Sequence, residues 1–317
     1  MRILNHKHID ELVDWEALIL TIEKAYQTQL SGCFNMPQRM HIHQNDNTLL
    51  LMPCFTENRF ATKLVSVFPN NVKNNQPAIY GQVILNDGET GEAKALLNGG
   101  KLTAIRTGAV GACAMQKLDP NATTLGVVGA GAQGQYQAIA AAHILPLKTV
   151  FIFDLNPESV KQFKETVSEK APQLEIVAVQ STTELVKQSE IVVTATTSPT
   201  PVLPDNQQLL KGKTFIGIGS FKPNMQEFPE ALFHLIDECY IDTIHAQHET
   251  GDIIQPLVNR WIDQSQLVPF AQLLQKERAP QKTQLFKSVG MALFDIYVAN
   301  WLYDQALKID IGTEIEL

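Results

Sequence analysis

The sequence predicts an α/β protein in which a doubly wound parallel sheet of the Rossmann type is inserted into a second, α+β domain. Three observations predict this fold. Short apolar runs alternate with helical stretches in the middle of the chain, and a glycine-rich turn follows the first of these runs. The residue pattern at the two ends of the chain does not show this alternation. The length of 317 residues exceeds one average domain, so two units fit the chain.

The first third of the chain is expected to be a helix followed by a mostly antiparallel sheet. Residues 10–30 carry apolar side chains at intervals near 3.6, with acidic residues between them, which is typical of an amphipathic helix. Runs rich in branched and aromatic residues follow over residues 48–97, separated by proline, asparagine and glycine. Residues 86–91 form a turn signal between two of these runs.

The middle of the chain is expected to form the parallel sheet. Apolar runs that suit buried strands occur at residues 125–128, 150–153, 176–179, 191–195, 215–218 and 240–241. The alternation ends by about residue 280, and a terminal helix over residues 286–307 is expected to return to the first domain. The predicted division is therefore 1–117 plus 281–317 in one domain and 118–280 in the Rossmann domain.

A glycine-rich turn after the first strand of that sheet indicates a dinucleotide site. Gly129, Gly131 and Gly134 have the spacing G-x-G-x-x-G, and residues 135–144 offer a helix after them. Only glycine permits such a sharp turn and the close approach of a pyrophosphate to the free N–H groups of a helix. The turn, including Ala132 and Gln133, is therefore predicted to bind the cofactor.

Asp154 ends the next strand and favours NAD(H) as that cofactor. A carboxylate there can accept hydrogen bonds from both ribose hydroxyls and would repel a 2′-phosphate. A bent side chain or Lys161 could still admit NADP(H). Thr196, Thr197 and Ser198 follow the fourth strand, at the strand ends that line a Rossmann crevice, and are expected to contact the adenosine or the ribose.

Charge and composition argue against several other classes of protein. The 25 Lys and Arg residues against 33 Asp and Glu give a net charge of -8, without a basic cluster for nucleic acid. No apolar stretch reaches the roughly 18 residues of a membrane span, and no export signal is visible. Four scattered cysteines suit free thiols in a reducing compartment, so a cytoplasmic location is predicted.

Five polar residues near the end of the Rossmann unit are interpreted as structural or solvated. Asp242 and Asp252 stand at a strand end and in a turn, where aspartate often bonds the local backbone. His245 and His248, with Glu249, lack a further ligand at a convincing spacing. No catalytic metal is therefore expected.

Seven separated motifs resemble the ornithine cyclodeaminase and mu-crystallin family, and they stand in that family's order. They cover residues 36–39, 63–66 with 69–71, 101–109, 129–134, 219–227, 249–252 and 286–290. The resemblance implies a Rossmann domain set into a substrate-binding domain whose sheet also forms the interface of a homodimer. It also implies hydride exchange between nicotinamide C4 and the carbon that carries an amino acid's nitrogen, by way of an imine.

The resemblance implies that the carboxylate of a small amino or imino acid is bound by Arg39, Lys63 and Arg106, and that the cofactor is contacted by Thr107. Cationic side chains are natural partners for a carboxylate. Without the resemblance, each of the three would be interpreted as an ordinary surface charge. Lys63 begins an apolar stretch, where partial burial would lower its pKa and let it protonate the imine, although a purely electrostatic role fits equally well.

The segment after the fifth Rossmann strand distinguishes branches of the family. The cyclodeaminases carry an aspartate two residues before a proline and six before a glutamate, and alignment on Pro223 and Glu227 puts Phe221 there, after Ser220. A phenyl ring can neither act as a base nor pair with a charged amine. Phe221 could also be a mere packing residue. Ser220 and Phe221 are both assigned to the cofactor crevice.

These features predict an NAD(P)H-dependent imine reductase. Its expected substrate is a cyclic ketimine acid, either Δ1-pyrroline-2-carboxylate, which gives L-proline, or Δ1-piperideine-2-carboxylate, which gives L-pipecolate. An ornithine cyclodeaminase or an alanine-type amino acid dehydrogenase is the enzymatic alternative. A non-catalytic, mu-crystallin-like ligand-binding protein is the alternative of another class.

Overall fold

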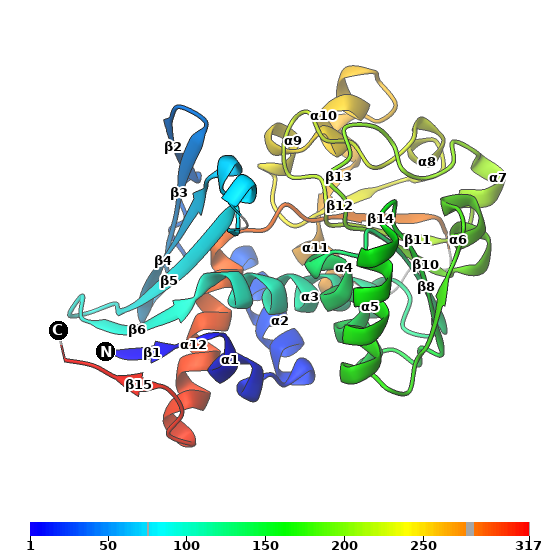
Figure 1. The fold of residues 1–317 in the computed structure, drawn as a ribbon. Helices are drawn as coiled ribbons and strands as arrows, with labels where there is room; N and C mark the ends of the chain where they lie inside the picture. Colours follow the sequence, from blue (N-terminus) through cyan, green and yellow to red (C-terminus); the bar gives the residue numbers. More distant parts are fainter. Residues whose placement is uncertain (75, 277–281, 317) are drawn as a thin grey trace. The chain divides into compact units, whose positions relative to one another are not determined.

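The computed structural model describes residues 1–74, 76–276 and 282–316, and the chain folds into two compact units (Figure 1). Unit 1 contains Met1–Arg106 and Met291–Leu317, and unit 2 contains Thr107–Gly290. The first division lies inside a continuous helix, α3 (Gly99–Leu118), so the boundary expected at residue 117 marks the end of that helix instead. The second expected boundary, 280/281, lies outside the described residues. Among the described helices, none is long and apolar enough to span a membrane.

Unit 1 is built on a seven-stranded sheet in the order β15-β1-β6-β5-β4-β3-β2. Five strands form an antiparallel meander: β2 (Met40–Gln44), β3 (Asn47–Phe55), β4 (Arg59–Val67), β5 (Ile79–Asp87) and β6 (Ala93–Asn98). Next to them, β1 (Arg2–Leu4) pairs in parallel with β6 and antiparallel with β15 (Thr313–Glu314). A short 3-10 helix, η1 (Pro69–Asn74), joins β4 to β5. The predicted turn between β5 and β6 is confirmed, since Asp87 accepts hydrogen bonds from the N–H groups of Glu89 and Thr90.

The helices of unit 1 differ from the prediction at two places. The single helix expected over residues 10–30 is two helices, α1 (His6–Leu12) and α2 (Trp15–Ser31), because Val13 is extended and Asp14 caps α2 through the N–H of Ala17. The terminal helix α12 (Ala292–Lys308) begins at residue 292 and not at 286. The residues before it are unavailable for a helix because they form a strand of the other sheet.

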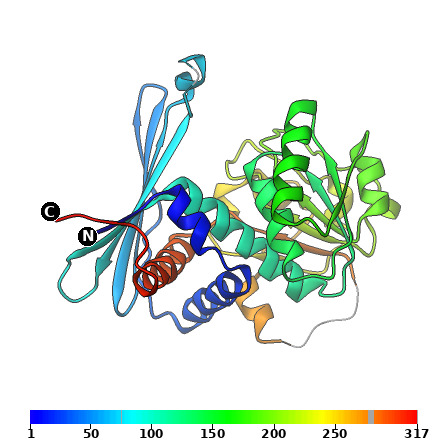
Figure 2. The ribbon, with the colours of Figure 1, turned by 60° about the horizontal axis from the view of Figure 1, so that its bottom comes forward.

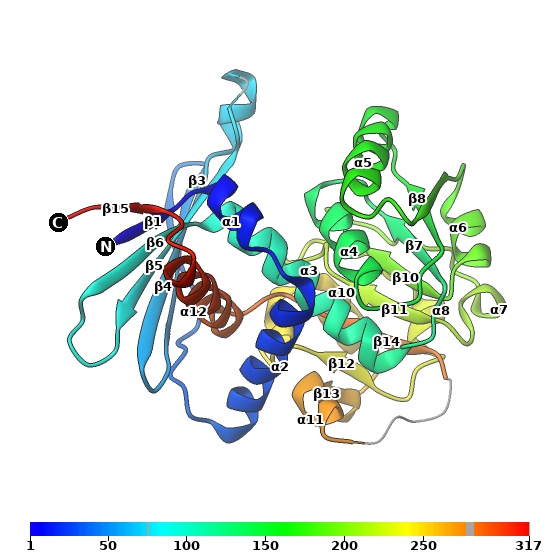
Figure 3. The same ribbon diagram turned by 90° about the horizontal axis from the view of Figure 1, so that it is seen from below.

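The two faces of the unit 1 sheet have different surroundings. Helix α12 packs against β3, β4 and β5 and also against α2. Figures 2 and 3 show α12 beside one face of this sheet, while no described helix of unit 1 lies on the other face. Successive residues of a strand point to opposite faces. Neighbours such as Lys63 and Leu64 on β4 therefore face different environments.

Unit 2 is built on an eight-stranded, entirely parallel sheet in the order β13-β12-β14-β11-β10-β7-β8-β9. Its strands are β7 (Thr124–Val128), β8 (Thr149–Phe153), β9 (Glu175–Ala178), β10 (Ile191–Thr194), β11 (Thr214–Gly217), β12 (Cys239–Ile241), β13 (Leu267–Pro269) and β14 (Gln284–Lys287). The first strand, β7, lies between β8 and β10, so the strand order reverses there. Ligands of such sheets bind where this reversal occurs. The predicted doubly wound sheet is confirmed, and β13 and β14 are additions to it.

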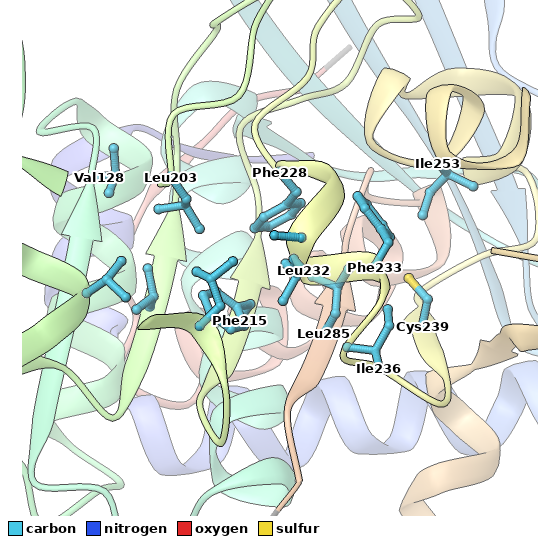
Figure 4. Close-up of a cluster of buried hydrophobic side chains, with 14 of the residues drawn as sticks. Val128, Leu203, Phe215, Phe228, Leu232, Phe233, Ile236, Cys239, Ile253 and Leu285 are labelled. Atoms are coloured by element: carbon cyan, nitrogen blue, oxygen red, sulfur yellow. The ribbon is translucent and has the colours of Figure 1, made fainter. Parts of the chain in front are cut away.

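The helices of unit 2 connect these strands and close its core. They are α4 (Ala132–Ala142), α5 (Pro157–Lys170), α6 (Thr182–Gln188), α7 (Gln207–Leu210), α8 (Glu230–Phe233), α9 (Ala246–Glu249), α10 (Gly251–Val258), α11 (Phe270–Leu274), the 3-10 helix η2 (Gln264–Gln266) and the second part of α3. Figure 4 shows buried aromatic and aliphatic side chains of β11, α8 and β14 packed together, among them Phe215, Leu232 and Leu285. This core supports the strand ends from which the candidate cofactor site is built.

Candidate functional site

The glycine turn after β7 has the backbone geometry of a dinucleotide-binding loop. Gly129 has a φ of 105°, and a Cβ on it would lie 2.7 Å from the carbonyl oxygen of Ala195. A Cβ on Gly134 would lie 2.0 Å from the carbonyl oxygen of Gly129, so only glycine lets α4 approach the strand end this closely. Both positions therefore require glycine for the fold itself.

Gly131 differs from the other two because the fold does not require it. It is exposed and forms the N-cap of α4, with φ -69° and ψ -176°, a conformation open to any residue. A Cβ there would meet no atom within 4 Å, and no side chain caps the first N–H groups of α4. Free N–H groups at a helix N-terminus attract a phosphate. The exposed Ala132 and half-buried Gln133 continue this first turn.

Asp154 lies directly after β8 and is held against the glycine turn. Its Oδ2 accepts a hydrogen bond from the N–H of Ala130 at 2.7 Å, and its Oδ1 accepts one from Asn156 at 2.8 Å. The carboxylate is thus fixed at the edge where a Rossmann acid meets the ribose. Lys161, the cation considered for a 2′-phosphate, faces Glu158 at 3.8 Å and is largely exposed.

A buried carboxylate, Glu227, joins the ends of β10 and β11. Its Oε1 accepts hydrogen bonds from the backbone N–H and the hydroxyl of Thr196, at 2.7 and 2.8 Å. Its Oε2 accepts from the N–H groups of Gly219 and Ser220, at 3.0 and 2.9 Å. The structure therefore brings together the two segments that the sequence assigned separately to the cofactor, residues 196–198 and 220–221. Glu227 was not among the site residues predicted from the sequence, where it only marked the alignment of this segment with the family.

Behind Glu227 lies a fully buried ionic cluster. Lys287 Nζ is 3.0 Å from Asp252 Oδ2 and 3.9 Å from Glu227 Oε2, and the three side chains have no exposed surface. Asp252 Oδ1 also accepts hydrogen bonds from the N–H groups of Glu227 and Phe228. Burial raises the pKa of Glu227, whereas the charge of Lys287 opposes this change. These contacts agree with the interpretation of Asp252 as structural.

The other predicted cofactor residues lie in unequal environments. Ser220 is buried, and its hydroxyl contacts the carbonyl of Met225 and the hydroxyl of Thr250. Phe221 is 44% exposed, with Lys222 Nζ 5.6 Å from its ring centroid, which disagrees with its interpretation as a buried packing residue. Thr107 is buried, and its carbonyl accepts a hydrogen bond from Gln137 at 2.7 Å. Their cofactor contacts stay predictions.

Unit 1 brings two of the three predicted substrate cations together around a carboxylate, Asp295, that was not predicted from the sequence. Lys63 Nζ on β4 lies 2.7 Å from Asp295 Oδ2, and Arg106 Nε on α3 donates to Asp295 Oδ1 at 3.1 Å. Lys63, Arg106 and Asp295 are 4%, 6% and 2% exposed, so all three charges are withdrawn from water. We call these three residues the Asp295 cluster.

The charges of the Asp295 cluster do not balance. Burial lowers the pKa of Lys63 to about 8; Asp295 opposes this change, whereas Arg106 and Arg39 add to it. The third predicted cation, the half-buried Arg39, therefore lies within electrostatic range of Lys63. Two buried cations share one carboxylate, and a buried charge without a counter-ion is costly. The cluster is consequently suited to receive one more negative charge.

Two further predictions concern the other carboxylates and the histidines. Asp242 Oδ2 accepts hydrogen bonds from the hydroxyl of Ser288 and the N–H groups of Val289 and Gly290, which are structural contacts. Within residues 1–74, 76–276 and 282–316, no three His, Cys, Asp or Glu side chains are grouped so that they could hold a metal ion. His245, His248 and Glu249 accordingly form no such group.

Comparison with known proteins identifies the family of this chain. The sequence profile of the ornithine cyclodeaminase/mu-crystallin family matches residues 1–310. The chain belongs to this family. The predicted resemblance is thus confirmed, and with it the Rossmann fold set between two segments of a second domain.

Individual relatives cover nearly the whole chain. It is 32% identical to a Δ1-pyrroline-2-carboxylate reductase of Bacillus cereus, over 98% of this chain and 96% of that one. It is 24% identical to an alanine dehydrogenase of Archaeoglobus fulgidus, over 99% and 98% of the two chains. A Δ1-pyrroline-2-carboxylate reductase from Thermococcus litoralis, solved in complex with NADH and L-proline, is similar in structure, with a TM-score of 0.91 and 28% identity over 99% of this chain and 100% of that one.

Proposed function

We propose that this protein reduces a cyclic ketimine acid with NADH, and that Δ1-pyrroline-2-carboxylate, which yields L-proline, is its first candidate substrate. The observation that carries the proposal is the Asp295 cluster, in which two buried cations share one carboxylate and so favour one more negative charge, such as that of a substrate carboxylate. The relatives named as Δ1-pyrroline-2-carboxylate reductases support the choice of reaction. Δ1-Piperideine-2-carboxylate has the same carboxylate and imine with one more methylene, so it is the second candidate.

NADH would be held by the glycine turn and Asp154. The open side of Gly131 and the uncapped start of α4 fit its pyrophosphate, and the carboxylate of Asp154 fits the ribose hydroxyls. When bound, NADH supplies the hydride. The related reductase from Thermococcus litoralis binds NADH, which supports NAD(H) as the favoured cofactor.

Arg106 and Lys63 would fix the substrate by its carboxylate. Arg106 uses Nε for Asp295, and within the described residues its two terminal nitrogens form no hydrogen bond. A guanidinium edge with two free donors suits a carboxylate, and Arg39 adds a third cation. Binding of the carboxylate by these side chains orients the reactive carbon, and orientation can lower the activation free energy by several kcal/mol.

Lys63 would deliver the proton that the reaction needs. Reduction of the C=N bond adds a hydride to carbon and a proton to nitrogen. A lysine with a pKa of about 8 remains mostly charged near neutral pH, yet it releases its proton far more readily than an ordinary lysine. Its ammonium group would protonate the imine nitrogen and then regain a proton from water.

The assay that tests this function is the loss of NADH absorbance with each of the two cyclic imines. We expect reduction by the wild-type protein and its loss in Lys63→Ala. Lys94→Ala is the matched control, because Lys94 lies in the same unit but is partly exposed and paired with Glu92. A wild-type protein that binds NADH but oxidises it with neither imine would refute the proposal and favour a ligand-binding protein.

The same preparation distinguishes the enzymatic alternatives. The exposed phenyl ring of Phe221 stands where the cyclodeaminases carry an aspartate, so we expect no ammonia from L-ornithine with catalytic NAD. An alanine-type dehydrogenase would instead reduce NAD with L-alanine. Either activity above the rate of imine reduction would replace the proposed function.

We further propose that two copies of the chain form a homodimer through the uncovered face of the unit 1 sheet. The strand register places two rows of side chains there, Met40-Leu51-Leu64 and Ile42-Leu49-Ser66-Tyr80. Met40, Ile42, Leu49 and Tyr80 are between 37% and 52% exposed. A contiguous apolar face of this kind suggests an interface. Analytical ultracentrifugation should show a dimer for the wild type and a monomer for Ile42→Glu. A wild-type protein that sediments as a monomer would exclude the proposed dimer.

A cytoplasmic location is the remaining part of the proposal. None of the four cysteines forms a disulfide, and Cys54, Cys113 and Cys239 are buried, as suits a reducing compartment. Fractionation of cells followed by immunodetection tests this location. Recovery in a secreted or periplasmic fraction would exclude it.

A further inference from the structure

We propose that Asp295 is a positioning residue of the reductase, whose two carboxylate oxygens hold Lys63 and Arg106 at fixed places and keep Lys63 in its proton-carrying form. This inference rests on the proposed function. It assigns to the first turn of α12 a part in proton delivery, although Asp295 itself would contact neither substrate nor cofactor.

The geometry of Asp295 divides its oxygens between two elements of unit 1. Oδ2 lies 2.7 Å from Lys63 Nζ on β4, whereas Oδ1 accepts from Arg106 Nε on α3 at 3.1 Å. One carboxylate on α12 thus sets the separation of the proposed proton donor from the proposed carboxylate ligand. An interaction through Nε, and not through the terminal nitrogens, leaves the outer edge of the guanidinium for the substrate.

The other surroundings of Lys63 oppose its positive charge. Its strand neighbours in the register are Met52 on β3 and Val83 on β5, both buried and apolar. Arg106 and Arg39 are cationic, and the nearby Cys54 thiol stays neutral because burial and Asp295 raise its pKa to about 12. Among these groups, Asp295 alone favours the ammonium form of Lys63. Without it, the lysine would lose its proton at a lower pH.

A purely structural explanation exists for an aspartate at this position. A carboxylate in the first turn of a helix is favoured by the partial positive charge of the helix N-terminus. That explanation predicts an effect on the stability of α12 but none on the pH dependence of the reaction. The two explanations therefore differ in a measurable way.

The test compares pH profiles of kcat/KM for imine reduction in the wild type, Asp295→Asn and Asp304→Asn. Removal of an opposite charge at this distance should move the alkaline limb of the profile to lower pH by about one unit or more and lower kcat by about 10- to 100-fold. The KM for NADH should stay within about twofold. Asp304 lies on the same helix but is half exposed and paired with Arg59, so Asp304→Asn should change neither limb nor rate.

A second variant keeps the proposal testable if Asp295→Asn does not fold. Asp295→Glu retains the charge but displaces it by one methylene, so we expect the alkaline limb to stay within about half a unit while kcat falls about 10-fold. A folded Asp295→Asn with the wild-type limb, or an Asp295→Glu with the wild-type kcat, would overturn the positioning role. Absence of imine reduction in the wild type would instead refute the proposed function itself.

Discussion

Substitution of Gly131 by alanine should separate cofactor binding from folding. Gly131 already has a φ of -69° and a ψ of -176°, and its new Cβ would meet no protein atom within 4 Å. The folded state would therefore meet no clash, and the reduced freedom of the unfolded chain would favour folding by about 0.4–1 kcal/mol. Alanine is a poorer N-cap residue than glycine by a similar amount, so the two effects offset each other and the free energy of unfolding should stay within about 1 kcal/mol of the wild type. For a unit of this size the midpoint of thermal unfolding should then stay within about 4 °C.

The same methyl group would project into the place proposed for the pyrophosphate. We expect the Kd for NADH to rise at least about 10-fold, which is a loss of about 1.4 kcal/mol. The assay is a fluorescence titration with NADH, together with thermal unfolding without and with the cofactor. Gly134→Ala is the contrasting variant, because its Cβ would lie 2.0 Å from a backbone oxygen and should destabilise unit 2 itself. A Gly131→Ala protein that binds NADH within twofold of the wild type would refute the assignment.

Three other outcomes follow from the buried charges. In the wild type, kcat/KM for imine reduction should fall as the pH rises through about 8, since Lys63 then loses its proton; a profile flat to pH 10 would argue against Lys63 as the acid. Lys63→Met should abolish reduction yet raise the free energy of unfolding by about 1–3 kcal/mol below pH 8, because folding there forces Lys63 to keep a proton that the folded state binds less tightly than the unfolded chain does. This gain should vanish above about pH 10.5, where the lysine is neutral in both states. Urea unfolding at several pH values measures it. Lys287→Met should cost about 3–5 kcal/mol in urea unfolding, because Glu227 and Asp252 would remain buried without their cation. Lys282→Met, which removes an exposed partner of Asp237, should cost less than about 1 kcal/mol, and equal effects of the two would contradict a buried ionic cluster.

The Rossmann sheet and its glycine turn could be predicted because their signals are local. Each strand from β7 to β12 is a short apolar run, and the G-x-G-x-x-G spacing follows from backbone geometry. Strand β14 was not expected, and its last two residues, Phe286 and Lys287, were assigned to the terminal helix. Its four residues include only two apolar ones, and they lie close to the apolar residues of α12 in the sequence, so no separate apolar run marks the strand.

The charge clusters could be predicted only in part. Lys63 and Arg106 were found through the family resemblance, but their counter-ion, Asp295, lies 189 residues beyond Arg106 and still further beyond Lys63. A signal for Asp295 was present: it shares its helix face with Ala299, Leu302 and Ala306, all of them buried. A single carboxylate on the apolar face of a helix indicates a buried cation nearby, although it cannot say which one.

The proposed dimer face of the unit 1 sheet makes the stability of β4, which carries the proposed proton donor, depend on the protein concentration. On β4, Lys63 points to the face that carries α12, whereas its neighbour Leu64 points to the face proposed for dimer contact. Anything that binds only the folded chain stabilises it by mass action, and a second copy is such a partner. Dilution should then lower the melting temperature of unit 1, and reconcentration should restore both the melting temperature and the activity. Because β4 carries both the proposed proton donor and a residue of the proposed interface, a substitution at Leu64 should displace Lys63 without contacting the substrate.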